Sequence, residues 1–215
     1  LQGEPDGLAV SAAFVTGARE VAARDLSFDV CVRESQLPDI ARLAGAIPEL
    51  RLVLDHLGKP AVGTAASPLA PSAEWARDLT ELARHANAFC KLSGLPGEAG
   101  GDWSAEQLEP FLDVAADAFG VERLMWGSDW PVSVIGPAED GDPHAPEDGS
   151  ATYQATARSR WADTVIAWAQ SRGHDLDALL WRNAEQFYRT DRPRQLPTDK
   201  TPRSGLRGWL RGHRG

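Results

Sequence analysis

The sequence predicts an α/β fold in which the strands form a parallel sheet. Strand-like and helix-like segments alternate along the chain, the pattern of successive βαβ units. Nearly every strand-like run is apolar on both faces, as expected where helices cover a sheet. The 215 residues suit one domain of ordinary size, and no fixed-period repeat of the solenoid kind is present.

Four short apolar runs are the predicted strands. Their apolar residues are bounded by turn-forming residues and are too few for helices of ordinary length. They lie at residues 27–32, 51–56, 88–93 and 123–127. The last of them leads into Gly127, Ser128 and Asp129, and then into a proline that cannot continue a ladder of hydrogen bonds.

Helices are predicted between and around these strands, at 8–24, 37–47, 72–86, 104–119, 153–171 and 175–188. Ser72 and Ser104 are suitable N-cap residues, since a serine hydroxyl can accept from a free backbone N–H of the first turn. Pro48 ends the second helix, and Gly120 supplies a stop signal after the fourth.

Charge is distributed unevenly along the chain. The net charge is −9, but residues 191–215 contain seven Lys or Arg and two acids and so carry +5, which leaves −14 on residues 1–190. We expect residues 1–190 to form the domain and 191–215 to be a basic, disordered tail, because the tail has few apolar residues. An acidic main domain argues against nucleic-acid binding there.

Composition also indicates the cellular compartment in which the protein is expected. Apolar runs are too short for a membrane span, and no signal-peptide pattern opens the chain. Cys31 and Cys90 lie in strand-like runs, where buried free thiols are favoured over a disulfide, so we expect a cytoplasmic protein. The chain begins at Leu1, and its only methionine is Met125, which fits a fragment, a processed chain or a partial sequence.

The segment 132–150 is rich in Gly, Pro, Asp and Glu. A loop of this length is usually a lid or disordered. Its acids and His144 could bind a cation, but a solvated loop is the favoured interpretation.

Two residues at strand ends are the candidate catalytic groups. Asp129 follows the last strand, and His56 ends the second. The carboxyl ends of parallel strands are where α/β enzymes place catalytic groups. Asp129 would be a general base or a metal ligand, and His56 would polarise a carbonyl or bind the metal. The structural alternatives are a helix-capping aspartate and a histidine satisfied within the core.

Three further residues are candidate substrate contacts. Lys91 and Arg33 also follow the strand pattern and would bind substrate oxygens or a carboxylate. Trp130 would form an apolar wall beside Asp129. A structural ion pair is the alternative for Lys91. No His-x-His, His-Glu-x-x-His or Cys-x-x-Cys spacing occurs, so the visible motifs do not assemble a complete metal site.

Three motifs resemble the amidohydrolase-related family, most closely its sugar-lactonase branch of L-fuconolactonase, L-rhamnonolactonase and pyrone dicarboxylate lactonase-like proteins. They are Leu54-Asp-His-Leu-Gly-Lys-Pro60, Cys90-Lys-Leu-Ser-Gly94 and Leu124-Met-Trp-Gly-Ser-Asp-Trp-Pro-Val132. The resemblance spans about residues 1–190, and the opening residues 1–6 resemble the segment after the fourth barrel strand of that branch.

The resemblance implies a (β/α)₈ barrel of which this chain holds the second half, strands five to eight. It implies that Asp129 is the catalytic acid/base after strand eight and that His56 lines the site. The His-x-His of strand one is absent here together with strands one to four. Such a half barrel has two free sheet edges and would dimerise, aggregate or need its other half.

We therefore expect a hydrolase that acts on a sugar-type lactone or carboxylate by attack of water on the carbonyl. A zinc-like divalent metal is the candidate cofactor of the complete enzyme, held by His56 and Asp129. A related metal-dependent decarboxylase or amide hydrolase is one alternative, and a non-catalytic half barrel or binding module is another. The expected partners are a small-molecule substrate and either a second copy or the missing half of the barrel.

Overall fold

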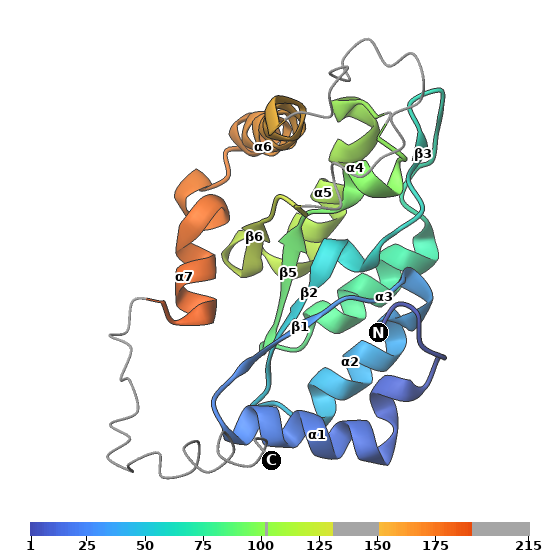
Figure 1. Ribbon diagram of the computed structural model, residues 1–215, viewed down its shortest axis with the longest axis vertical. Helices are drawn as coiled ribbons and strands as arrows, with labels where there is room; N and C mark the ends of the chain where they lie inside the picture. The colour runs from blue at the N-terminus through green and yellow to red at the C-terminus, as the bar shows by residue number, and fades with distance from the viewer. Residues whose placement is uncertain (102, 131–150, 191–215) are drawn as a thin grey trace, which may run out of the picture.

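The computed structural model describes residues 1–101, 103–130 and 151–190, and it contains one parallel sheet of four strands (Figure 1). Their order in the sheet is the order of the chain, so each crossover joins neighbouring strands. The strands are β1 (Ser27–Val30), β2 (Arg51–Leu54), β5 (Ala88–Leu92) and β6 (Leu124–Trp126). The predicted α/β fold with a parallel sheet is confirmed.

The helices follow the predicted alternation. They are α1 (Ala12–Ala23), α2 (Leu37–Ala46), α3 (Ala73–Ala83), α4 (Leu95–Glu98), α5 (Ala105–Phe119), α6 (Ala151–Arg172) and α7 (Asn183–Tyr188). Single helical turns lie at Leu8–Val10, Glu34–Gln36, Asp55–Gly58 and Val121–Arg123, and a π-helical segment at Ala178–Arg182 precedes α7. A two-residue hairpin that was not predicted, β3 (Gly63–Thr64) with β4 (Ser67–Pro68), lies before α3.

The predicted helix ends are confirmed where a side chain or glycine sets them. The hydroxyls of Ser72 and Ser104 accept from the backbone N–H groups of Trp75 and Gln107, at 3.1 and 3.3 Å. Gly120 ends α5 with a positive φ of 71°, a conformation that costs glycine little.

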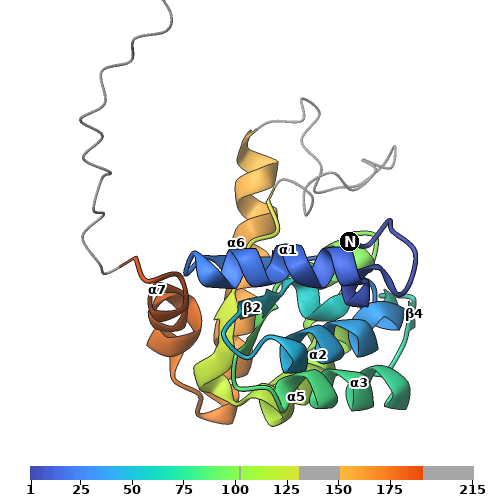
Figure 2. The ribbon, with the colours of Figure 1, turned by 90° about the horizontal axis from the view of Figure 1, so that it is seen from below.

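The main hydrophobic core lies on one face of the sheet. Side chains alternate along a strand, and Leu52, Leu54 and Cys90 point to the face covered by α2, α3 and α5. These three helices lie side by side in Figure 2, with α7 well apart from them. Trp161 and Trp168 of α6 complete this core.

The opposite face of the sheet has much less cover, which corrects the prediction of helices over both faces. Val53 and Met125 point to this face, and among the described residues they form a small cluster with Phe187 of α7. Half-buried Phe89 and Tyr188 pack against it. The apolar residues on this face of the strands therefore pack on one short helix.

Each strand ends before its predicted limit, and this changes how the candidate residues are presented. β2 ends at Leu54 and β6 at Trp126, so His56 and Asp129 lie in the turns that follow. Strand alternation would place His56 on the face of Leu54 and Asp129 on the face of Met125, but this expectation is wrong because both residues lie beyond the strand ends. Their side chains are aimed by turn geometry and not by strand alternation. The loop at 132–150 and the tail at 191–215 lie outside the described residues.

Candidate active site

The candidate site is built from turns at the carboxyl ends of three neighbouring strands. His56 follows β2, Ser93 follows β5, and Asp129 follows β6. Parallel strands deliver these turns to one edge of the sheet. The structure therefore brings together the two residues that the sequence singled out as catalytic, His56 and Asp129.

The His56 ring has a polar partner at each nitrogen. Its Nδ1 lies 2.8 Å from the Ser93 hydroxyl, and its Nε2 lies 3.3 Å from Oδ1 of Asp129. The ring and its carboxylate partner are largely enclosed, since the side chains of His56 and Asp129 are 15% and 11% exposed. The ring is therefore fixed in orientation and shielded from much of the solvent.

The backbone that carries His56 has an uncommon conformation. His56, Leu57, Gly58 and Lys59 all have positive φ values, at 56°, 53°, 74° and 53°. Only Gly58 adopts this region without cost, and each non-glycine residue there is less stable by roughly 1–2 kcal/mol. Asp129 also has a positive φ of 54°. Strain of this kind is common at functional sites, where surrounding contacts maintain it.

Two glycines make room for this arrangement. A Cβ on Gly94 would lie 2.5 Å from Cβ and 2.6 Å from Cγ of His56, so no larger residue fits beside the ring. A Cβ on Gly127 would lie 3.2 Å from Cβ of Ser93. Both glycines belong to the motifs Leu-Ser-Gly and Trp-Gly-Ser-Asp, and the structure gives a steric reason for them.

Burial shifts the protonation of both central groups towards their neutral forms. Burial lowers the pKa of His56 below its ordinary value, although Asp129 and Asp55 oppose that shift. Burial likewise raises the pKa of Asp129, while the charges of His56 and Lys59 counteract it. A histidine that stays neutral and a carboxylate of increased basicity suit proton transfer near neutral pH.

Lys91 lies in a separate ionic cluster on the less covered face of the sheet. Its Nζ is 2.6 Å from Asp29 Oδ2 and 2.8 Å from Asp55 Oδ1, and the Tyr188 hydroxyl donates to Asp29 at 2.7 Å. Burial lowers the pKa of Lys91, but the hydrogen bonds to Asp29 and Asp55 outweigh it and raise that pKa overall. Burial and the bond to Asp29 raise the pKa of Tyr188 to about 12. The cluster joins α7 to β1, to β5 and to the turn after β2.

Arg33 and Trp130 lie at the exposed edge of the candidate site. Arg33 is exposed after β1, and its backbone N–H donates to Gln36 at 3.0 Å. Trp130 is 58% exposed. Among the described contacts, no hydrogen bond or ion pair joins Lys91, Arg33 or Trp130 to His56 or Asp129.

Two residues at the site were missed as functional candidates. Ser93 ends the predicted strand at 88–93 and was given no role, whereas it contacts His56. Lys59 is the other: its side chain is only 14% exposed, and its Nζ lies 3.6 Å from Oε1 of Glu98. Its charge lowers the pKa of both His56 and Asp129, so it is a cation close to the pair. The signal was present in the sequence, because both belong to the quoted motifs.

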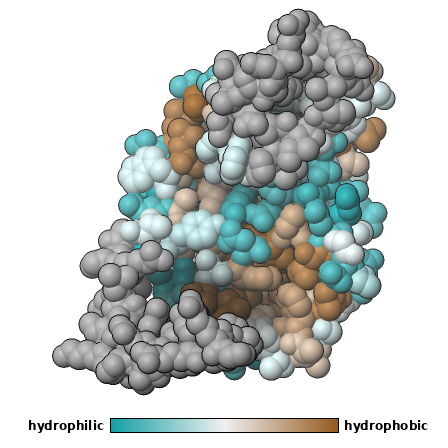
Figure 3. All heavy atoms as spheres, in the orientation of Figure 1, coloured by the Kyte–Doolittle hydropathy of each residue, from teal (hydrophilic) through white to brown (hydrophobic). Residues whose placement is uncertain are grey.

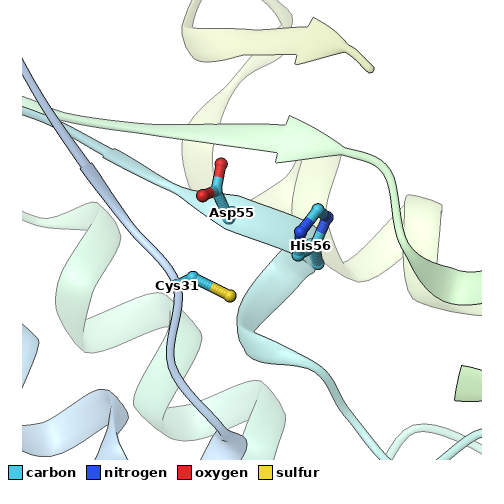
Figure 4. Close-up of side chains that lie close together, drawn as sticks. All are labelled: Cys31, Asp55 and His56. Atoms are coloured by element: carbon cyan, nitrogen blue, oxygen red, sulfur yellow. The ribbon is translucent and has the colours of Figure 1, made fainter. Parts of the chain in front are cut away.

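A group of donor atoms suited to a metal lies beside His56. The thiol of Cys31, the carboxylate of Asp55 and the ring of His56 offer ligand atoms within 4.8 Å of one another, and they come from the ends of β1 and β2 (Figure 4). Sulfur, oxygen and imidazole nitrogen are the ligands that zinc takes in proteins. Burial raises the pKa of the Cys31 thiol, so a metal there would have to displace its proton.

The family model described as Amidohydrolase matches residues 2–190. The chain belongs to the amidohydrolase family. This membership confirms the resemblance drawn from the three motifs, and it assigns the parallel sheet to the TIM-barrel superfamily.

The family includes curated relatives with named activities. The chain is 37% identical over 177 residues to an L-fucono-1,5-lactonase of Burkholderia ambifaria and 41% identical over 181 residues to one of Burkholderia multivorans. The matches cover 80% and 79% of this amidohydrolase chain but 52% and 56% of those proteins. The chain thus spans about half the length of the curated relatives it matches.

Solved structures also match most of this chain while this chain covers only part of theirs. A Burkholderia multivorans amidohydrolase, described with bound zinc, matches with a TM-score of 0.69 at 36% identity, over 87% of this chain and 62% of that one. A putative 2-pyrone-4,6-dicarboxylic acid hydrolase of Pseudomonas putida matches with a TM-score of 0.57 at 21% identity, over 90% of this chain and 62% of that one, and supports the fold alone.

In the part of the chain that the structure describes, no helix is both long and apolar enough to cross a membrane.

Proposed function

We propose that the protein is a hydrolase of sugar-type lactones and that this chain carries its general base, Asp129. The observation that supports this most directly is the enclosed pair of Asp129 and His56, 3.3 Å apart at the carboxyl ends of the strands. The two relatives named L-fucono-1,5-lactonase support the substrate class.

In the proposed reaction, Asp129 accepts a proton from a water molecule as the water oxygen attacks the lactone carbonyl carbon. The ring C–O bond then breaks, and Asp129 returns the proton to the departing alkoxide, so that the product is a hydroxy acid. Burial favours this role because it makes the Asp129 carboxylate a stronger base.

Charge on the carbonyl oxygen needs donors in the enclosed site. We assign this role to His56 and to Lys59, whose cation lies near the pair. Lys91 and Arg33 are proposed to bind more distant substrate oxygens, and Trp130 to contact the apolar side of the substrate. Lys91 shares its ammonium with Asp29 and Asp55, so we expect it to contribute less than Lys59.

The donor set of Cys31, Asp55 and His56 fits a zinc-like metal chemically, and we propose these residues as its ligands in place of a set with His56 and Asp129 alone. A metal on either ring nitrogen would replace the contact of that nitrogen with Ser93 or Asp129, so ligation by His56 is the alternative to its donor role and does not accompany it. When bound, such a metal would polarise the lactone carbonyl as a Lewis acid. Asp129 would remain free to move the proton.

We further propose that β1, β2, β5 and β6 are strands five to eight of a (β/α)₈ barrel. Three observations support this: the strand order follows the chain, helices cover mainly one face, and the chain spans 52–62% of its relatives. Among the described residues, β1 and β6 each have one unpaired edge. In the view of Figure 3, hydrophobic side chains gather low on the molecule, over β1 and α1, and Leu26 beside β1 is 54% exposed. We propose that further strands, from a longer chain or a second copy, pair with these edges.

The test is an assay of the naturally encoded protein with L-fucono-1,5-lactone and other sugar lactones as substrates. Hydrolysis is monitored through the protons that the hydroxy-acid product releases. Asp129→Asn is expected to lower kcat by about 10²–10⁴-fold. Asp117→Asn, at an exposed position on α5, is the matched control and is expected to retain the rate. An unchanged rate in Asp129→Asn would show that Asp129 is not the base, and a wild-type protein that hydrolyses no lactone would refute the proposed function.

A further inference from the structure

We propose that, in the metal-free protein, Ser93 is a positioning residue that holds the His56 ring in one orientation and one tautomer, with Nδ1 as the acceptor and the Nε2–H directed at Asp129. This inference deepens the proposed function and rests on its assignment of His56. Its test measures the state of the ring and not turnover, so the two proposals can fail separately.

The first support is the contact itself. Ser93 Oγ lies 2.8 Å from Nδ1 of His56, within the usual range for a hydrogen bond of a hydroxyl. The Ser93 residue is 1% exposed, and among the described residues His56 is the only hydrogen-bond partner of its hydroxyl. A buried hydroxyl without this bond would be costly, so the pairing is maintained.

The second support is that both partners lie against glycine backbone that has no side chain of its own. Ser93 is flanked by Gly127, where a Cβ would lie 3.2 Å from Cβ and 3.5 Å from Oγ of Ser93. The His56 ring packs on Gly94, where a Cβ would lie 2.8 Å from Nδ1. The serine hydroxyl and the ring thus meet in a slot with glycines on two sides.

The third support fixes the direction of the bond. Ionised Asp129 has no proton to donate, so Nε2 at 3.3 Å must carry the hydrogen that faces it. A neutral imidazole then has an unprotonated Nδ1, which can only accept. Ser93 is the donor to that nitrogen, because its hydroxyl can turn its hydrogen towards the ring.

The consequence for the site is a defined proton on the reactive side of the ring. With Ser93 bound to Nδ1, the Nε2–H lies next to the Asp129 carboxylate and is available to an oxygen that enters the site. Without Ser93, Asp129 would be the one polar partner left to the ring among the described residues. The preference for the Nε2–H tautomer would then be weaker, and the ring would be freer to rotate about χ2.

The experiment is ¹⁵N NMR of the full chain labelled at histidine, at mildly alkaline pH where the imidazole is neutral. The chain has five histidines, and His56→Gln assigns the signal of His56. In the wild-type protein we expect an unprotonated Nδ1 and a protonated Nε2 for His56. In Ser93→Ala we expect shifts averaged between the tautomers, and in Ser93→Cys a partial return towards the wild type, since a thiol is a weaker donor.

Ser104→Ala is the matched control, because it removes a serine hydroxyl that caps α5 away from the ring. It should lower stability by about 1 kcal/mol and leave the His56 signals unchanged. A wild-type His56 with its proton on Nδ1 overturns the proposal without any variant. So does a Ser93→Ala protein whose His56 signals match those of the wild type. If Ser93→Ala does not fold, the His56 tautomer measured in the wild-type protein and in Ser93→Cys still tests the proposal.

Discussion

Replacing Gly94 with alanine is expected to displace His56 and destabilise the protein far more than the added methyl group suggests. The new Cβ would lie 2.5 Å from Cβ, 2.6 Å from Cγ and 2.8 Å from Nδ1 of His56, all below the closest approach of real Cβ atoms. Gly94 also has a φ of 76°. Left-handed backbone costs alanine roughly 1–2 kcal/mol and overpacking roughly 1–3 kcal/mol, so we expect a loss of about 2–5 kcal/mol in the free energy of unfolding.

Gly100→Ala separates these two contributions. Gly100 has a similar φ of 71°, but an added Cβ would meet nothing within 4 Å. Its loss should therefore be the backbone cost alone, about 1–2 kcal/mol. Both variants are measured by urea unfolding followed by tryptophan fluorescence, together with the His56 signals in histidine ¹⁵N spectra.

We expect Gly94→Ala to shift the His56 signals and Gly100→Ala to leave them as in the wild type. Equal losses of stability in the two variants, with unchanged His56 signals in both, would refute the reasoning. That result would mean that the ring moves aside freely and that Gly94 does not determine its position.

Three further predictions concern other parts of the molecule. Cys90 is fully buried and Cys31 partly exposed, so a thiol reagent should modify Cys31 in the folded protein and Cys90 only after unfolding; equal reaction rates would contradict this burial. Because burial lowers the pKa of His56, the unfolded chain binds its proton more readily below about pH 6.5, and stability should fall as pH drops from there through the folded pKa. In a plot of the urea midpoint against pH from 8 to 5, His56→Gln should show a smaller loss of stability at low pH than the wild type. Identical plots for the two proteins would contradict this assignment to His56. Tyr188→Phe removes the bond to Asp29 and should lower stability by about 1 kcal/mol in urea unfolding, whereas no loss would show that this bond does not fasten α7.

The predicted fold was largely correct because its signals are local. Apolar runs, the caps Ser72 and Ser104 and the stop at Gly120 each act over a few residues, and all correspond to real element ends. The strand limits were less accurate. Asp55 and His56 follow the apolar residues of β2 directly, with no glycine or proline before them. Nothing in the residue types therefore marks the left-handed turn that begins at His56.

The candidate site was predicted in part. His56 and Asp129 were found because acids and histidines at strand ends converge in a parallel sheet, and they do lie together. Lys91 shows the limit. Its partners Asp29 and Asp55 are 62 and 36 residues away along the chain, and the register of β1 against β2 and β5 brings their carboxylates within 3 Å of its ammonium. Tyr188 reaches the same cluster through Asp29 because α7 docks there.

The sequence by itself determined that four parallel strands alternate with helices and that an aspartate and a histidine follow two of their ends. Alternation and composition suffice for this because they depend on neighbours along the chain. The tertiary structure alone decided which face of the sheet the helices cover and which partner each nitrogen of His56 receives. Those features depend on strand register and on the left-handed backbone of residues 56–59, which bring Ser93, Gly94 and Asp129 around one ring.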